Sequence, residues 1–224
     1  MRPELKAVVQ AGGLRREPGA ARNAHRGTVG GWSVWAAILG MGPGPAAAVT
    51  SEILALETFD HVMVVGIAGG LDPALPVGAL MVPAEVGHYP DGPRRSSHPL
   101  AGRVAAGCLM TTDGLFSDDR IWQPLRDDGV GAVDMEAAGV ADVCEAAGVP
   151  WSVYRGISDR PDEHIVDQAV FGLSKPDGSA NPTAVVRYLA RDPRRAKALA
   201  HLNRCMQDAA RVAAEAAFAD LASS

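Results

Sequence analysis

Short apolar runs that alternate with helix-like stretches constrain the fold of this chain more than any other feature. The strand-like runs occupy residues 6–13, 32–40, 61–70, 79–86, 107–113 and 150–159. Near-continuous apolar runs are typical of strands that are buried on both faces of a sheet. Their alternation with helices indicates an α/β fold. We therefore predict one domain over residues 1–224, with a central mixed β-sheet flanked by helices.

Composition narrows the class of protein. A length of 224 residues with 47% hydrophobic residues suits a single globular domain. The net charge is -5, and the basic doublets at 94–95 and 194–195 do not form the clustered positive surface that nucleic acids require. No apolar run approaches the roughly 20 residues that span a bilayer. The three cysteines are far apart and predict neither a disulfide framework nor a zinc site. We expect a cytoplasmic protein that binds no nucleic acid and no membrane.

Two carboxylates begin a predicted helix over residues 135–148. They are Asp134 and Glu136, in the segment VDMEAAG at residues 133–139. Asp134 is placed to cap the helix by accepting from free backbone N–H groups. A negative charge at Glu136 is favoured by the helix dipole. Small residues follow Glu136 and leave room for a ligand, so its carboxylate is also suited to accept two adjacent hydroxyls, such as those of a ribose.

A second group of polar residues ends the strand-like run at 150–159. The segment YRGISD places Arg155, Ser158 and Asp159 there, and Gly69 ends an earlier run. In open α/β sheets, ligands bind beyond the carboxyl ends of the strands. Asp159 could equally cap the breaker-rich turn that follows. We expect residues 161–193 to be irregular, with 165–193 forming a flap or an interface loop.

Two longer blocks carry a resemblance to a known family. The blocks are VDMEAAGVADVCEAAGVPWSVYRGISD and GIAGGLDPALPVGALMVPAEV. They resemble segments of the nucleoside phosphorylase superfamily, and the resemblance follows the family's order over residues 6–159. They are most similar to its 5′-methylthioadenosine/S-adenosylhomocysteine nucleosidase branch, although the Gly-rich block also resembles hopanoid-associated phosphorylases. The resemblance implies a nucleoside phosphorylase-like fold, a homodimer, a small-molecule nucleoside as partner, and no metal or organic cofactor. The activity implied is hydrolysis of a purine ribonucleoside with release of adenine.

The resemblance also implies a role for each site residue. Glu136 would accept from the ribose 2′- and 3′-hydroxyls, with Met135 under the sugar. Asp159, oriented by Ser158, would protonate N7 of the purine. Arg155 would hold the acidic residues. The water-activating glutamate would be Glu17, in GGLRRE. Further substrate contacts would come from Ile67, Ala68, Gly69, Leu115 and Phe116.

The sequence departs from the family at the nucleophile site. Ile67 stands where members often carry a hydroxyl residue, and the early Gly-Asp-Pro-x-Arg loop of phosphorylases is missing from the sequence. Two alternatives to hydrolysis stay open: a phosphorylase that uses phosphate as co-substrate on a 5′-modified adenosine, and a non-catalytic nucleoside-binding module. Arg15, Arg16 and Arg26 could supply positive charge to a phosphate. The 5′ substituent and the choice between adenine and hypoxanthine also stay open.

The chemistry predicts how the ionisable groups behave. A general acid must be protonated, so burial should raise the pKa of Asp159. Arg155 should therefore face the other carboxylates rather than Asp159. Glu136 should stay ionised, because it lies beside the positive charge that develops on the sugar.

Overall fold

A computed structural model describes residues 2–18, 24–115, 119–160, 168–173, 175, 181–192 and 194–224. Its main sheet has seven strands in the order β5-β10-β4-β9-β8-β6-β7 and mixes parallel with antiparallel pairs. The strands are β4 (Val62–Gly70), β5 (Leu80–Met81), β6 (Glu85–His88), β7 (Arg95–Ser96), β8 (Cys108–Thr111), β9 (Val130–Asp134) and β10 (Trp151–Asp159). The predicted central mixed sheet is confirmed.

A second, smaller sheet precedes the main one in the chain. Its antiparallel strands are β1 (Arg15–Arg16), β2 (His25–Val29) and β3 (Trp32–Ala36). Gly30 and Gly31 connect β2 to β3 with φ values of 57° and 89°. A two-residue hairpin turn with positive φ at both positions matches the twist of the strands it joins, and glycine adopts it without a steric penalty.

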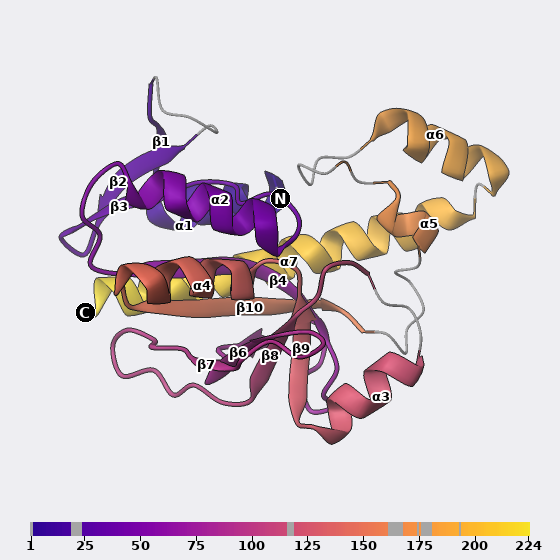
Figure 1. The fold of residues 1–224 in the computed structure, drawn as a ribbon. Coiled ribbons are helices and arrows are strands. Elements are labelled where there is room, and N and C mark those ends of the chain that lie inside the picture. The colour runs from indigo at the N-terminus through magenta and orange to yellow at the C-terminus, as the bar shows by residue number, and fades with distance from the viewer. Residues whose placement is uncertain are drawn as a thin grey trace.

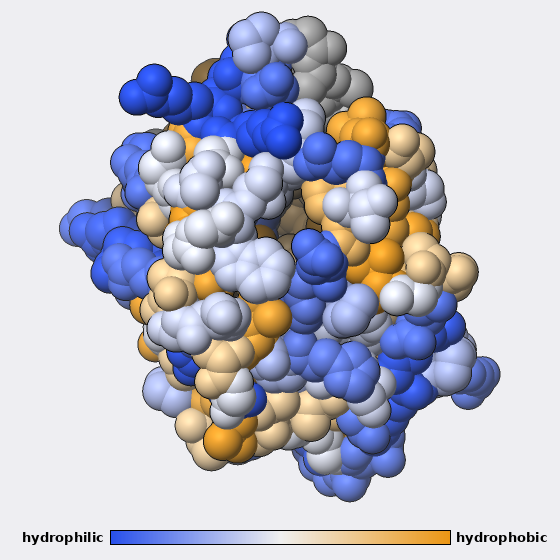
Figure 2. All heavy atoms as spheres, turned by 90° about the vertical axis from the view of Figure 1, so that its left-hand side faces the viewer, coloured by the Kyte–Doolittle hydropathy of each residue, from blue (hydrophilic) through white to orange (hydrophobic). Residues whose placement is uncertain are grey.

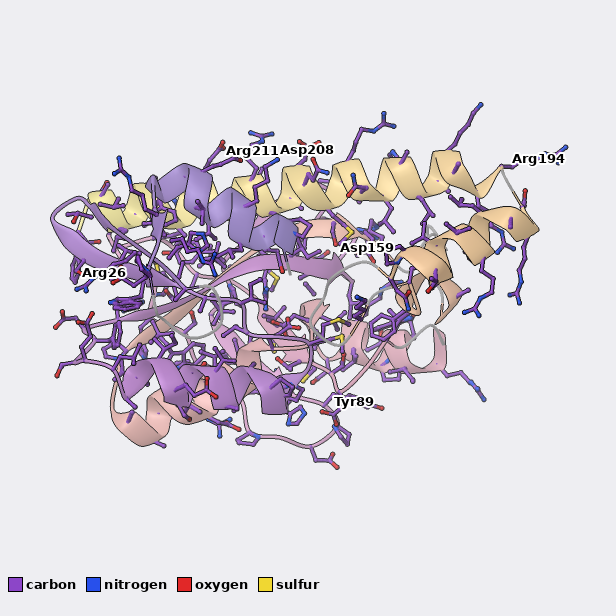
Figure 3. All side chains as sticks on the ribbon, turned by 90° about the horizontal axis from the view of Figure 1, so that it is seen from above. Arg26, Tyr89, Asp159, Arg194, Asp208 and Arg211 are labelled. Carbon is purple, nitrogen blue, oxygen red and sulfur yellow. The ribbon has the colours of Figure 1, made fainter. Side chains whose placement is uncertain are left out.

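Helices cover both faces of the main sheet, as predicted (Figure 1). The long helix α7 packs on β10 and β4 and also against α1, whereas α4 lies on the other face and packs against α2. Figure 3 shows α7 running along the molecule, with Asp208 and Arg211 on its outer side. The helices are α1 (Arg2–Gly12), α2 (Pro43–Leu54), α3 (Asp119–Asp127), α4 (Ala137–Ala147), α5 (Gln168–Phe171), α6 (Pro182–Arg191) and α7 (Arg195–Ala222). Across the described ranges, none of these helices is long and apolar enough to cross a membrane.

Small residues set the spacing between the layers. A side chain on Gly156 of β10 would collide with the backbone of Ala209 in α7, and one on Gly139 of α4 would collide with Pro43 of α2. The face of α7 at this contact is built of buried alanines, Ala209, Ala210, Ala213, Ala214 and Ala217. Close approach of helix and strand lets the apolar atoms pack at the density of a protein interior.

Two predicted strands differ from the structure. Residues 6–13 form most of helix α1 rather than a strand. The consecutive valines Val8 and Val9 favour a strand locally, but both pack on the cluster around Phe218 of α7. This tertiary contact outweighs the weak intrinsic preference of β-branched residues. Residues 79–86 are also not one strand: β5 and β6 lie on opposite sides of Pro83, which lacks the N–H that a sheet interior needs.

The region predicted to be irregular contains ordered helix. Helix α6 begins after Asn181, whose side chain accepts a hydrogen bond from the amide of Ala184. Such an N-cap satisfies one of the free donors of the first turn. The prediction of an irregular stretch over 161–193 was therefore wrong for residues 168–171 and 182–191. Residues 161–167, 174, 176–180 and 193 of this stretch, which include parts of the flap expected over 165–193, lie outside the described part of the chain.

Candidate active site

One buried arginine organises the acidic residues of the site. Arg155 lies in β10 and is 2% exposed. Its Nε donates to Asp134 Oδ2 at 3.1 Å, and its Nη2 donates both to Asp134 and to Glu136 Oε2, the latter at 3.3 Å. Its Nη1 lies 3.8 Å from Oε1 of Glu4. As expected, Arg155 faces carboxylates, and three of them surround one guanidinium.

Asp134 is held by the ends of β8 and β9. Its Oδ1 accepts from the Thr111 hydroxyl at 2.6 Å, and its Oδ2 accepts from the amide of Ala137 at 3.1 Å. The amide of Ala138 in turn donates to the Thr111 hydroxyl at 2.9 Å. The predicted acceptance from free amides at the helix start is confirmed. Asp134 therefore fixes Arg155, which in turn contacts Glu136.

Glu136 stands at the N-cap position of α4 and makes no side-chain capping bond there. It lines a cavity together with Glu4 and Arg155. Burial raises the pKa of Glu136 to about 7; Arg155 opposes the shift, while Asp134 and Glu4 add to it. Our expectation that Glu136 stays ionised is thus only partly met in the free protein, because two like charges and poor solvation offset the guanidinium.

Glu4 is an acidic residue of the cavity that the sequence reasoning missed. It lies in the first turn of α1, where its Oε1 accepts from the amide of Ile67 at 3.0 Å. Glu17 follows β1, and its amide donates to the carbonyl of Ala24. Among the described residues that line the cavity, Glu4 is present and Glu17 is not. An acid at the start of a helix with apolar residues at 5, 8 and 9 was the available signal, and reading residues 6–13 as a strand concealed it.

Gly66 of β4 provides the space in which Glu4 meets Arg155. A Cβ at this position would collide with Oε1 of Glu4 and Nη1 of Arg155. Gly66 is also the register partner of Arg155 in the adjacent strand, so both point to the same face of the sheet. The glycine therefore permits a contact that any other residue would displace.

We expect Gly66→Ala to lower turnover at least tenfold, because the added methyl group must push both side chains out of position. Gly44→Ala is the matched control, since a Cβ at Gly44 meets no atom within 4 Å. The measurement is kcat for the nucleoside cleavage that the sequence predicts, beside the melting temperature of each variant. Equal kcat values for the two variants would contradict a role for this space.

Asp159 lies beyond the arginine cluster, at the carboxyl end of β10. The hydroxyl of Ser158 donates to its Oδ1 at 2.5 Å. Gly69 of β4 is its register partner, and a Cβ on Gly69 would lie 3.7 Å from Oδ2 of Asp159. The bond from Ser158 orients the carboxyl, as the sequence predicts. The acid is thus separated along the strand from Arg155.

The remaining predicted substrate contacts that the structure describes are not among the residues that line the cavity of Glu4, Glu136 and Arg155. Ala68 is buried, whereas Ile67, Gly69, Met135 and Leu115 are half-buried. Phe116 lies outside the described residues. Among the side chains that the structure describes, no group of three His, Cys, Asp or Glu could hold a metal ion.

Comparison with solved structures defines the class of fold. The chain superposes on the 5′-methylthioadenosine/S-adenosylhomocysteine nucleosidase from Neisseria meningitidis in complex with methylthio-immucillin-A, with a TM-score of 0.73, 20% identity, and coverage of 100% of this chain and 96% of that one. It also superposes on futalosine hydrolase of Helicobacter pylori with a TM-score of 0.72, at 18% identity, covering 99% and 94% of the two chains. At these identities the likeness shows a shared fold.

Sequence comparison then assigns the family. The model of the Phosphorylase superfamily matches residues 1–105 and 95–191, and this chain belongs to that family. A curated relative is the 5′-methylthioadenosine/S-adenosylhomocysteine nucleosidase of Anoxybacillus flavithermus. It is 31% identical over 172 residues, which cover 60% of this chain and 71% of the relative. The predicted family is confirmed.

Proposed function

We propose that this chain hydrolyses the N-glycosidic bond of a purine ribonucleoside of the 5′-methylthioadenosine or S-adenosylhomocysteine type and releases adenine. The observation that carries the proposal is the placement of Glu4 and Glu136 around Arg155 in one cavity. The names of the relatives agree with this substrate class.

Cleavage of the bond builds positive charge on the sugar and negative charge on the purine. In the proposed mechanism Glu136 accepts hydrogen bonds from the 2′- and 3′-hydroxyls and stabilises the developing cation. Asp159, oriented by Ser158, donates a proton to N7 of the leaving base. Glu4 takes the role that we expected of Glu17 and removes a proton from the attacking water. General acid and general base groups each accelerate such a step by roughly 10²–10⁴-fold.

Charge favours water over phosphate as the nucleophile. Of the described residues that line the cavity, Arg155 is the one arginine, lysine does not occur, and three carboxylates surround the guanidinium. A phosphate anion would meet a net negative field there. The candidate phosphate ligand Arg26 instead bonds Ser33, pairs with Glu57 and stacks on Trp35. Arg15 and Arg16 lie exposed on β1.

The direct test measures adenine release from 5′-methylthioadenosine, S-adenosylhomocysteine and adenosine, each with and without phosphate. We expect release that does not depend on phosphate, with the free sugar, which keeps its 5′ substituent, as the second product rather than its 1-phosphate. Strict dependence on phosphate would assign the chain to the phosphorylases. Binding of adenine without turnover of any substrate would support the non-catalytic module instead.

The pH dependence should report Glu136. Because the pKa of Glu136 is raised to about 7, we expect kcat/KM to increase between pH 6 and pH 8 as the carboxylate that accepts the sugar hydroxyls forms. Glu136→Gln should lower kcat/KM and remove this rise. A raised native pKa also means that the folded protein binds more protons than the unfolded chain, so this group's stabilising contribution falls as pH rises from 4.5 to about 7. A wild-type profile without a rise near pH 7 would contradict the assignment.

The homodimer, the cytoplasmic location and the independence from cofactors stay predictions. Sedimentation equilibrium tests the first. Turnover after dialysis against a chelator tests the last, and we expect it to be unchanged.

A further inference from the structure

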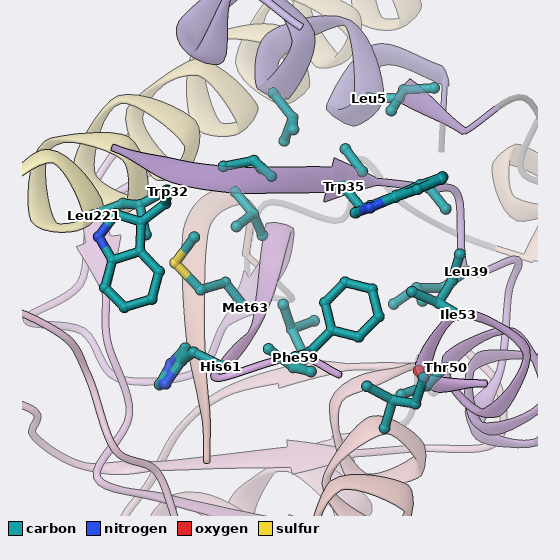
Figure 4. Close-up of a pocket in the computed structure, with 18 of the residues that line it drawn as sticks. Leu5, Trp32, Trp35, Leu39, Thr50, Ile53, Phe59, His61, Met63 and Leu221 are labelled. Carbon is teal, nitrogen blue, oxygen red and sulfur yellow. The ribbon is translucent and has the colours of Figure 1, made fainter. Parts of the chain in front are cut away.

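The cavity that Glu4, Glu136 and Arg155 line also extends between the two sheets of this protein. Its volume is about 300 Å³, and strands β3 and β4 form two of its sides. Figure 4 shows this gap, with Trp32 and Trp35 on the side of β3 and Phe59 and Met63 on the side of β4. Figure 2 views the molecule from the left-hand side of Figure 1 and shows a recess bordered by polar as well as apolar residues. We call this cavity the inter-sheet slot. Its apolar lining includes Leu5, Val8, Val34, Ile53, Met63 and Val65.

The edge of β4 that borders the slot has free main-chain hydrogen-bonding positions. On one side β4 pairs with β10 along its length, but on the other side β9 meets it only at Gly69 and Gly70 in the described sheet. The amide of Ile67 points to that second side, where the Glu4 carboxylate accepts it. Backbone groups of a strand alternate in direction, so those of Val65 and Met63 point to the same side.

The edge of β3 is open in the same way. In the described small sheet the order is β1-β2-β3, which makes β3 an edge strand with β2 on one side. Every second residue of β3 therefore directs its amide and carbonyl away from β2. The residues of β3, from Trp32 to Ala36, all line the slot. Two open strand edges thus border a single cavity whose lining is apolar in large part.

These features determine what can fill the slot. Buried amides and carbonyls need hydrogen-bond partners, and an apolar wall offers none. A small apolar ligand would cover the walls and leave both edges unpaired. An added β-strand satisfies both requirements at once, because its main chain pairs with the edges while its side chains contact the walls. The succession β3, α2, β4 is typical of a β-α-β unit, which builds strands of one sheet.

We propose that the inter-sheet slot binds an extended, apolar polypeptide strand of five or six residues, which pairs with β3 and β4 and joins the two sheets. The five residues of β3 correspond to about 17 Å of extended chain. Leu5 and Val8 of α1 line one wall and Ile53 of α2 lines another, so the strand is apolar on both faces. Glu4, Glu57 and Asp60 also line the slot, so basic residues flank the strand better than acidic ones.

The probe for the unmodified protein is the peptide acetyl-Lys-Val-Val-Ile-Val-Val-Lys-amide. Its control carries the same side chains but has N-methyl groups on alternate residues, which abolish pairing along one edge. We expect the first peptide to change the fluorescence of Trp32 and Trp35 with saturation, and the control to bind at least tenfold more weakly. Hydrogen exchange at the amides of Met63 and Val65 should slow at least tenfold with the first peptide alone.

A second experiment fuses the strand covalently to the protein. Glu4 lines the slot, so helix α1 begins beside it, and the same seven-residue sequence as in the peptide can be fused directly ahead of Arg2. Fusion raises the effective concentration of the strand and removes the weak-affinity limit of a free peptide. We expect the fused protein to melt at a higher temperature and its Met63 and Val65 amides to be protected. A fusion in which the strand residues are replaced by glycine and serine is the control.

The possible results distinguish a peptide strand from an apolar ligand as the occupant of the slot. Equal binding of the two peptides, or protection by decanol alone, would show a cavity for apolar ligands and overturn the proposal. Unchanged exchange at Met63 and Val65 in both experiments would overturn it as well. None of these measurements depends on nucleoside cleavage, so the proposed enzymatic activity is tested separately.

Discussion

Glu4→Gln is expected to lower kcat for adenine release by two to four orders of magnitude, the usual contribution of a general base. The glutamine keeps the size of the side chain and can still occupy the space beside Gly66. It cannot take a proton from water, and it replaces the charge that lies 3.8 Å from Nη1 of Arg155. Rate measurements at saturating 5′-methylthioadenosine isolate the effect on the chemical step.

Glu17→Gln is the matched control, and it should change kcat less than twofold. Each substitution removes one carboxylate from the N-terminal forty residues. Glu4 is among the described residues that line the cavity, and Glu17 is not. The reverse result, with Glu17→Gln inactive and Glu4→Gln active, would show that Glu17 is the general base, as the resemblance implies.

Asp159→Asn is expected to reduce adenine release by a similar factor, because an amide can donate a hydrogen bond to N7 but cannot deliver a proton. The bond from the Ser158 hydroxyl can persist to the amide oxygen, so the geometry is kept. The loss should therefore lie in kcat, with a smaller change in KM. Asp113→Asn is the control: this exposed acid follows the neighbouring strand β8 and bonds His88.

The leaving group provides a second criterion for Asp159. From a 5′-methylthioriboside of p-nitrophenol, p-nitrophenolate departs as a stable anion and needs little protonation. We expect Asp159→Asn to cleave this substrate within about tenfold of the wild-type rate, while Glu4→Gln stays slow on it because water must still be activated. Equal loss on both substrates would show that Asp159 acts on the structure of the site and not as the acid.

Much of the fold was predictable because it is encoded locally. The apolar run of β4 and that of β10 are each nine residues long and end where the sequence predicts, at Gly70 and at Asp159. The helix after Glu136 ends at Gly148, whose left-handed conformation is typical of a glycine C-cap. In such segments the period of the pattern and the terminating residue act within a few positions of each other, so the sequence alone defines them.

The site was predictable only in part. Arg155, Ser158, Asp159 and Glu136 lie in two continuous segments, and strand and helix geometry places them without knowledge of distant contacts. By itself the sequence predicted these groups and determined the family and the mixed sheet. The tertiary structure decided that residues 2–12 are a helix packed on α7 and that Glu4 rather than Glu17 lines the cavity. It also decided that burial, together with like charges, raises the pKa of Glu136. The physical reason is that these properties depend on contacts between residues far apart in the chain, and no local pattern records them.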